Sequence, residues 1–197
     1  MNLTIVSCKI FKDELEKILP ALQKEISICK IDIQYLPAAL HIDERKIEAG
    51  IKGAFGNLQG QNKVLLYGCM CHTNMGSVAG ENLFLPMGNC IDSFITPKQK
   101  QEFENGLNIH YLTSGWVRFW KDIFAGKIDG WDPVTARMNL GVNDKALILD
   151  TGCLTITETD MFELFEYTGL SVEIASITLD YFTGNVIDLC KRFLNQL

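Results

Sequence analysis

The pattern of apolar and polar positions predicts strands and helices that follow one another along the chain. Residues 3–10 form a short run rich in β-branched side chains, as in a strand. Residues 13–26 then place apolar side chains three and four positions apart, which is typical of one buried face of a helix. Residues 29–36 alternate like a second strand, and residues 43–55 return to helical spacing after Asp43, a favourable N-cap. The chain therefore begins strand, helix, strand, helix.

The same alternation continues to the last residues. Further strands are predicted at 63–68, 81–86, 107–116, 145–152 and 170–178, and further helices at 89–95, 96–106, 117–126, 157–169 and 185–197. Thr96 and Pro97 have the order expected of an N-cap and a first helical residue, and Gly169 is a favourable helix end. Between the strands at 107–116 and 145–152, residues 127–144 are rich in turn-forming residues.

This order of elements predicts an α/β fold: a mainly parallel sheet with helices on both faces, Rossmann-like and doubly wound. The length of 197 residues suits one folding unit, so we expect a single domain over residues 1–197. Two lobes joined near residues 126–144 are the alternative.

Composition and charge exclude several classes of protein. The formal net charge is −6 and the Lys and Arg residues are scattered, which argues against a nucleic-acid-binding surface. No apolar run is long enough to span a membrane, and the N-terminal stretch becomes charged without the pattern of a secretory signal. We therefore expect a cytoplasmic protein whose seven cysteines are free thiols or thiolate ligands.

Most of the cysteines lie where the predicted strands end. In an open α/β sheet, ligands bind at the carboxyl ends of the strands. The residues expected at this edge are Cys8, His41, Cys69, Cys71, His72, Cys90, Trp116 and Cys153. Chance placement of a small, buried side chain is the competing explanation, and it is favoured for Cys29 and Cys190, whose neighbours are apolar.

A thiolate-rich metal site is the chemistry that this set predicts. We expect Cys8, Cys69 and Cys90 as ligands with His41 as the fourth, and Cys71, His72 and Cys153 as further candidates. Sulfur and imidazole ligands suit tetrahedral zinc or an iron–sulfur cluster. The spacing within "GCMCH" is weak evidence by itself, because neither paired Cys-x-x-Cys units nor His-Glu-x-x-His occurs.

Other catalytic motifs are absent or weak. No Gly-x-Gly-x-x-Gly follows the first strand, no Gly-Lys-Ser or Gly-Lys-Thr occurs, and no Gly-x-Ser-x-Gly elbow is present. The Asp-Thr-Gly at 150–152 is more typical of a plain turn, and His110 is expected to be structural. A cysteine nucleophile, Cys69 or Cys90 paired with His41 or His72, remains an alternative.

Six sequence blocks together resemble a known family. "VSCKIFKDELEKI", "LPAALH", "LLYGCMCHTNMG", "LPMGNCIDSFI", "HYLTSGW" and "YFTGN" are similar, in order and spacing, to the prokaryotic family known as domain of unknown function 1638. The family pattern matches Cys8, His41, Cys69 and Cys90, together with Gly115 and Trp116. The resemblance implies a pocket that also includes Tyr67, Gly68 and Asn74.

The resemblance also implies a setting. Family members occur in anaerobic archaea and bacteria, often beside corrinoid-dependent methyltransferase systems, which implies a corrinoid as cofactor and a corrinoid protein or methyltransferase as partner. This chain departs from the pattern where the family has Cys-Gly-Asn-Gly and a Pro-Arg before its Asp-Cys element, here "PMGNC". The missing charges put a shared substrate in doubt.

Three functions follow as hypotheses. The first is a thiolate-rich metal or metallocofactor-binding protein that acts in corrinoid-linked methyl transfer. The second is a non-catalytic accessory protein or chaperone for a corrinoid or metallocofactor. The third is a cysteine-dependent redox or nucleophilic enzyme, which requires one thiol of lowered pKa.

Overall fold

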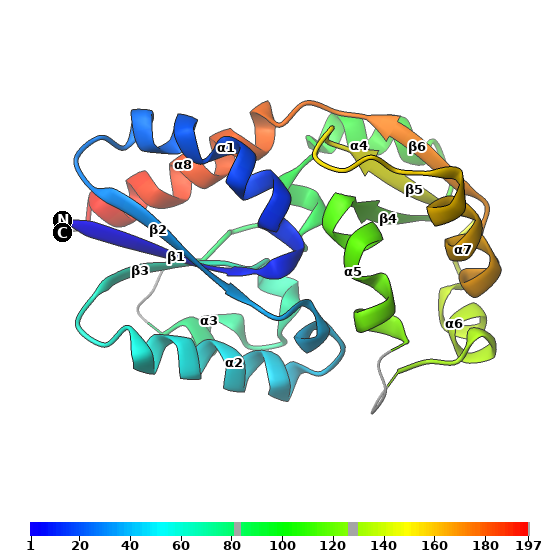
Figure 1. The fold of residues 1–197 in the computed structure, drawn as a ribbon, viewed down its shortest axis with the longest axis horizontal. Helices are drawn as coiled ribbons and strands as arrows, with labels where there is room; N and C mark the ends of the chain where they lie inside the picture. Colours follow the sequence, from blue (N-terminus) through cyan, green and yellow to red (C-terminus); the bar gives the residue numbers. More distant parts are fainter. Residues whose placement is uncertain (81–83, 126–129, 197) are drawn as a thin grey trace.

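Two parallel three-stranded sheets form the frame of the protein, in a computed structural model that describes residues 1–80, 84–125 and 130–196 (Figure 1). The first sheet has the order β2-β1-β3 and the second the order β4-β5-β6. The predicted α/β class with parallel, Rossmann-like strands is therefore confirmed, with the strands divided between two lobes. The strands are β1 (Asn2–Cys8), β2 (Lys30–Leu36), β3 (Asn62–Leu66), β4 (Ile109–Thr113), β5 (Lys145–Asp150) and β6 (Val172–Ser176).

Most α-helices lie in intervals that the sequence pattern predicts for them, but residues 89–95, predicted as a helix, contain only the 3₁₀ helix η4 (Ile91–Ser93). Of the strand predicted at 81–86, residues 81–83 are outside the described residues, and Phe84 forms only an isolated bridge. The α-helices are α1 (Lys12–Glu25), α2 (Glu44–Asn57), α3 (Met75–Ala79), α4 (Pro97–Glu104), α5 (Ser114–Phe124), α6 (Pro133–Leu140), α7 (Glu158–Thr168) and α8 (Asp180–Leu194). The expected caps are confirmed, because Asp43 and Thr96 accept hydrogen bonds at helix starts and Gly169 ends α7 with a positive φ. The short helices α3 and α6 were not predicted.

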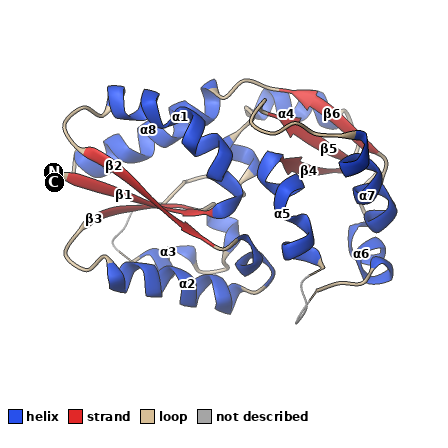
Figure 2. Cartoon of the chain, in the orientation of Figure 1, coloured by secondary structure: helices blue, strands red, loops and turns tan. Residues whose placement is uncertain are grey.

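The first lobe is a doubly wound unit. Helices α1 and α8 cover one face of its sheet, and α2 and α3 cover the other (Figures 1 and 2). The central strand β1 is buried over six of its seven residues, as expected of a parallel strand covered on both faces. In the second lobe, α5 packs against β4 and β5, and α7 packs against β6.

The chain crosses between the lobes twice. It passes from the first sheet to the second between β3 and β4, where Phe84 forms a parallel bridge to Leu65, and it returns after β6 through α8. Residues 130–144 lie within the second lobe, between α5 and β5. Residues 126–129, including the predicted helix end at Gly126, are outside the described residues. The first lobe therefore combines segments distant in sequence, because α8 returns to it after the second lobe is complete.

Side-chain packing joins the lobes into one core. The rings of Phe11, Phe94 and Phe182 stack on one another, with centroids 4.5 to 5.8 Å apart. A Cβ at Gly115, near the start of α5, would lie 1.8 Å from the carbonyl oxygen of Ile10, so only glycine permits this close approach of α5 to the first lobe. Within the described residues, no helix is both long and apolar enough to cross a membrane.

Candidate thiol site and its surroundings

Three cysteines from separate segments meet at the carboxyl edge of the first sheet. Cys8 is the last residue of β1, and the pairing of Ser7 with Leu66 places Cys8 beside the residue that follows β3, Tyr67. Parallel strands end at a common edge, which is why residues 8 and 67 lie together. Both side chains are almost fully buried.

Two loops at this edge are joined through their backbones. The amide of Cys69 donates to the carbonyl of Met87 at 2.8 Å, and the amide of Met70 donates to that of Gly88 at 2.7 Å. A Cβ at Gly68 would lie 2.9 Å from the Cα of Asn89, so glycine is needed for this contact. The joined loops carry Cys71, in the 3₁₀ helix η3 (Cys69–Cys71), and Cys90 to the same side.

The thiols of Cys8, Cys71 and Cys90 lie close enough to influence one another electrostatically. Burial raises the pKa of Cys8 to about 12, and the neighbouring Cys90 adds to the rise. Burial, followed by the influence of Cys90 and then of Cys8, raises the pKa of Cys71 to about 12. The pKa of Cys90 is also raised, mainly by burial. All three thiols are therefore protonated at neutral pH in the metal-free protein.

Two aromatic side chains border the thiols. The indole N–H of Trp116 donates to the sulfur of Cys90 at 3.5 Å, a contact that favours the thiolate and partly offsets the effect of burial. The hydroxyl of Tyr67 is buried next to the thiol of Cys8, and this contact falls short of a well-formed hydrogen bond. A buried hydroxyl with only a weak partner is costly, and it is the kind of group that a bound ligand satisfies.

The three sulfur atoms do not have the arrangement of metal ligands in this structure. Over residues 1–80, 84–125 and 130–196, no three His, Cys, Asp or Glu side chains are placed to hold a metal ion together. The donor set is chemically suited to zinc or an iron–sulfur cluster, but binding would require the thiols to approach one another and to lose their protons.

The remaining predicted ligands lie in different surroundings. Cys69 is exposed, with its sulfur 3.8 Å from the carbonyl of Gly88. The ring of His72 turns towards α2, where Nε2 lies 3.8 Å from Glu48, while Nδ1 accepts a hydrogen bond from the amide of Asn74. Asn74 itself caps α3. His41 belongs to the 3₁₀ helix η2 (Ala38–Ile42), and its side chain is outside the described residues.

Cys153 lies at another edge, where the second sheet ends. Its sulfur contacts the carbonyl of Thr151, within the Asp-Thr-Gly turn after β5. The hydroxyl of Thr151 donates to the buried carboxyl of Glu14 at 3.1 Å and contacts the hydroxyl of Ser114 at 2.9 Å. Lys17 donates to the carbonyls of Thr151 and Gly152. This turn therefore joins the second lobe to α1.

Glu14 is a member of this junction that the sequence analysis missed. It shares the buried face of α1 with Ile18 and Leu22, at helical spacing. A carboxyl group on an apolar helix face was the signal that could have identified it, because buried carboxyls are rare unless they have partners. Burial raises its pKa.

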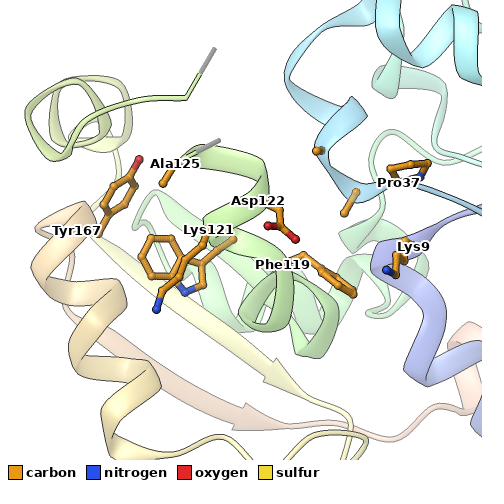
Figure 3. A pocket seen from close by; sticks show the side chains of 10 residues that line it. Lys9, Pro37, Phe119, Lys121, Asp122, Ala125 and Tyr167 are labelled. Atoms are coloured by element: carbon orange, nitrogen blue, oxygen red, sulfur yellow. The ribbon is translucent and has the colours of Figure 1, made fainter. Parts of the chain in front are cut away.

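Two cavities flank α5. One, of about 710 Å³, lies between α5 and η2 (Figure 3), where the ammonium of Lys9 lies 4.9 Å from the ring centroid of Phe119. Asp122 of α5 faces the same space. The other, of about 540 Å³, is lined by Cys90, Trp116 and His110 together with further aromatic and apolar side chains. Only the second cavity reaches the thiol site.

The fold and the site together define an α/β protein of two parallel sheets, with buried thiols at the carboxyl edge of the first. The chain belongs to the family described as protein of unknown function DUF1638, whose model matches residues 35–185. Searches among curated proteins and among solved structures found no match.

Proposed function

We propose that the protein binds a soft metal ion or a metallocofactor through the thiolates of Cys8, Cys71 and Cys90, with Cys69 or His41 as a fourth ligand. The observation that carries the proposal is the meeting of three cysteines from distant segments at the edge where α/β sheets bind ligands. Sulfur donors select zinc, iron–sulfur clusters or copper(I) over magnesium and calcium.

The environment of the thiols favours this proposal over a cysteine nucleophile. Nucleophilic cysteines need a thiolate at neutral pH, which a positive charge or a helix N-terminus usually provides. Here burial raises the pKa of each of the three thiols. A metal ion replaces the protons directly, because a coordinating thiol is deprotonated by the ion itself.

Metal binding requires a modest rearrangement around η3. The thiolates have to reach about 2.3 Å from a zinc ion, and Cys71 belongs to a turn of three residues that includes the exposed Met70. Movement of Cys71 towards Cys8 and Cys90 is the step that we expect on binding. Corrinoid-linked methyl transfer, with a corrinoid protein or methyltransferase as partner, stays a prediction that rests on the family resemblance.

Metal analysis of protein purified without oxygen and without a histidine tag tests the proposal. Zinc, iron, cobalt and nickel are measured per chain alongside the visible spectrum, which distinguishes a cluster and a corrinoid from colourless zinc. We expect roughly one metal ion or cluster per chain, and at least about a tenfold loss in Cys90→Ser. Cys29→Ser is the matched control, because Cys29 is a buried cysteine in the core of the same lobe.

Two results would overturn the proposal. One is protein without metal from both ordinary and metal-supplemented growth. The other is an unchanged metal content in both Cys8→Ser and Cys90→Ser.

A further inference from the structure

The outer lateral side of the second sheet is formed by β6, which lies beyond β5 in the order β4-β5-β6 (Figure 1). Along a strand, the N–H and C=O groups of successive residues point alternately to one side and to the other. The amide of Ala146 donates to the carbonyl of Ser171, and the amide of Ile177 donates to that of Asp150. The odd-numbered residues of β6 therefore bond to β5. The even-numbered residues direct their N–H and C=O groups away from the sheet, and they are Val172, Ile174 and Ser176.

These outward main-chain groups have no partner in the part of the chain that the structure describes. No described residue forms a hydrogen bond with the amides of residues 172, 174 and 176. Other outer strands are protected: on β2 the side chain of Gln23 accepts a hydrogen bond from the amide of Ile31 at 3.0 Å, and Phe84 forms a bridge beside β3. An unprotected outer strand is a template on which another strand can pair.

The side chains of β6 also leave the strand open to pairing. Charged side chains usually block an outer strand, but the one charged residue of β6, Glu173, is neutralised by Lys145 at 2.7 Å. At the centre of the strand, Ile174 is 41% exposed. An exposed apolar side chain and free main-chain groups on one strand point to an occupant that is itself a strand.

We propose that β6 pairs in antiparallel fashion with β6 of a second copy of this chain, with Ile174 opposite Ile174 at a two-fold axis. Residues 172, 174 and 176 then exchange hydrogen bonds with residues 176, 174 and 172 of the second copy, because all of them are directed outward. Glu173 lies opposite Ala175, so like charges do not face each other. The proposal goes beyond metal binding and does not depend on it.

The alternative registers of the two strands are less favourable. A shift in one direction places Glu173 opposite Glu173, where two like charges repel. A shift in the other direction places Ile174 opposite Ser176, which removes the contact between the two isoleucines. The charge and apolar pattern of β6 is therefore complementary to itself in the proposed register.

Helix α7 extends the contact. Stable dimers bury about 800 Å² per partner, which is more than a strand of five residues supplies. Since α7 packs against β6, the two-fold axis places both copies of α7 on the same face of the joined sheet. The exposed side chains of Phe162 and Phe165, one turn apart on α7, add the apolar area that the dimer needs.

Charge exchange at residue 174 tests the proposal, because the axis places each new side chain opposite its own copy. We expect wild type to be a dimer in sedimentation velocity at about 100 μM, with and without chelator. Ile174→Lys and Ile174→Asp should each weaken the dimer at least about tenfold, because like charges then face each other. An equimolar mixture of the two variants should recover the wild-type dissociation constant to within about threefold, because each Lys then faces an Asp.

Two further variants complete the test. Ile28→Lys is the matched control, because Ile28 is exposed in the first lobe and its substitution should leave the dimer unchanged. Ser176→Pro is the second variant should charges at residue 174 prevent folding. It removes an outward amide without loss of a bond to β5, and it should weaken the dimer at least about tenfold.

Three results would overturn the proposal. The first is a monomeric wild type at the same concentration, which would leave β6 to a strand of a different protein. The second is a dimer that persists in folded Ile174→Lys or Ser176→Pro. The third is a mixture of Ile174→Lys and Ile174→Asp that stays monomeric although wild type is a dimer.

Discussion

The carboxyl edges of the two sheets carry different chemical groups. The first edge carries the thiols of Cys8, Cys71 and Cys90, and the second carries the oxygen atoms of Thr151 and Ser114 next to the carboxyl of Glu14. At the second edge, hydrogen bonds and the ammonium of Lys17 connect β5 to α1 across the lobes. At the first edge the thiols have few such partners.

This difference separates a structural junction from a candidate site. At the junction, hydroxyl, carboxyl and ammonium groups form hydrogen bonds that hold the two lobes together, although Oε2 of Glu14 is buried without a partner among the described residues. A group of buried thiols beside the Tyr67 hydroxyl, whose contact with Cys8 is a weak one, gains little from its present contacts. The sequence analysis placed Cys153 among the candidate ligands. In the structure its sulfur lies beside Thr151, at the junction between the lobes.

Alkylation rates should show the largest contrast within the thiol edge. With a pKa of about 12, only about one in ten thousand Cys8 or Cys71 thiols is ionised at pH 8. We expect iodoacetamide to modify the exposed Cys69 at least about a hundredfold faster than either of them in metal-free protein. Mass spectrometry of the labelled peptides measures these rates.

Labelling in urea is the control, because unfolding removes burial and should make the cysteines react at similar rates. Modification of Cys8 or Cys71 in folded protein as fast as that of Cys69 would favour a cysteine nucleophile at this edge and contradict the proposed metal site.

Gly115→Ala should break the contact between α5 and the first lobe, on which both edges depend. The new Cβ would lie 1.8 Å from the carbonyl oxygen of Ile10, so the backbone must move. We expect the free energy of unfolding to fall by about 3 kcal/mol, measured by urea denaturation.

Gly53→Ala is the matched substitution in α2, where a Cβ meets no atom within 4 Å. It should raise the free energy of unfolding by up to about 1 kcal/mol, because alanine favours the helix. A similar effect of both substitutions would show that the close approach at Gly115 is not as tight as the structure has it.

Glu14→Gln tests whether the second edge is a structural junction that contains a protonated, buried carboxyl group. The folded pKa of Glu14 is raised by burial, so the stability that its proton contributes is fully present below pH 4.5 and is lost as the pH rises through the raised pKa. The difference in stability between Glu14→Gln and wild type should therefore shift in favour of the variant between pH 4.5 and neutral pH.

Urea denaturation across this pH range gives the difference, and Glu16→Gln is the control on the exposed side of the same helix. A constant difference between Glu14→Gln and wild type over the range would mean that Glu14 is ionised in the folded protein.

Arg118→Met should have the smallest effect. Arg118 pairs with Asp13 across the lobes at 2.9 Å, and the side chain of Arg118 is 43% exposed while that of Asp13 is 14% exposed. We expect a loss of about 1 kcal/mol or less in the free energy of unfolding, reduced further at high salt. A loss of stability as large as that caused by Gly115→Ala would show that this ion pair is the main connection between the lobes.

Local patterns predicted most of the elements, although not the absence of a strand at 84–86 or of an α-helix at 89–95. Helical spacing and caps are properties of a few neighbouring residues, so α1, α2, α4 and α7 were predicted close to their observed bounds. The core positions of Cys29 and Cys190 are confirmed for the same reason, because their apolar neighbours lie nearby in the sequence.

Contacts between distant residues account for what the sequence analysis missed. The division into two sheets depends on strand pairing, and no local pattern tells whether β3 and β4 are neighbours. The direction of the His72 ring depends on Glu48, and the position of Cys71 depends on backbone bonds to residues 87–88. His110 was expected to be structural; it lies in β4 as predicted, but it also lines a cavity whose other walls come from α5 and α6.

Cadmium titration of metal-free protein tests most directly the claim that the first edge, and not the second, binds a soft metal. Cadmium thiolates absorb in the ultraviolet, with an intensity that increases with the number of sulfurs bound. The account predicts a saturable signal of three or four thiolates that is strongly reduced in Cys90→Ser and unchanged in Cys153→Ser. A signal that survives Cys90→Ser, or one that Cys153→Ser removes, would contradict it.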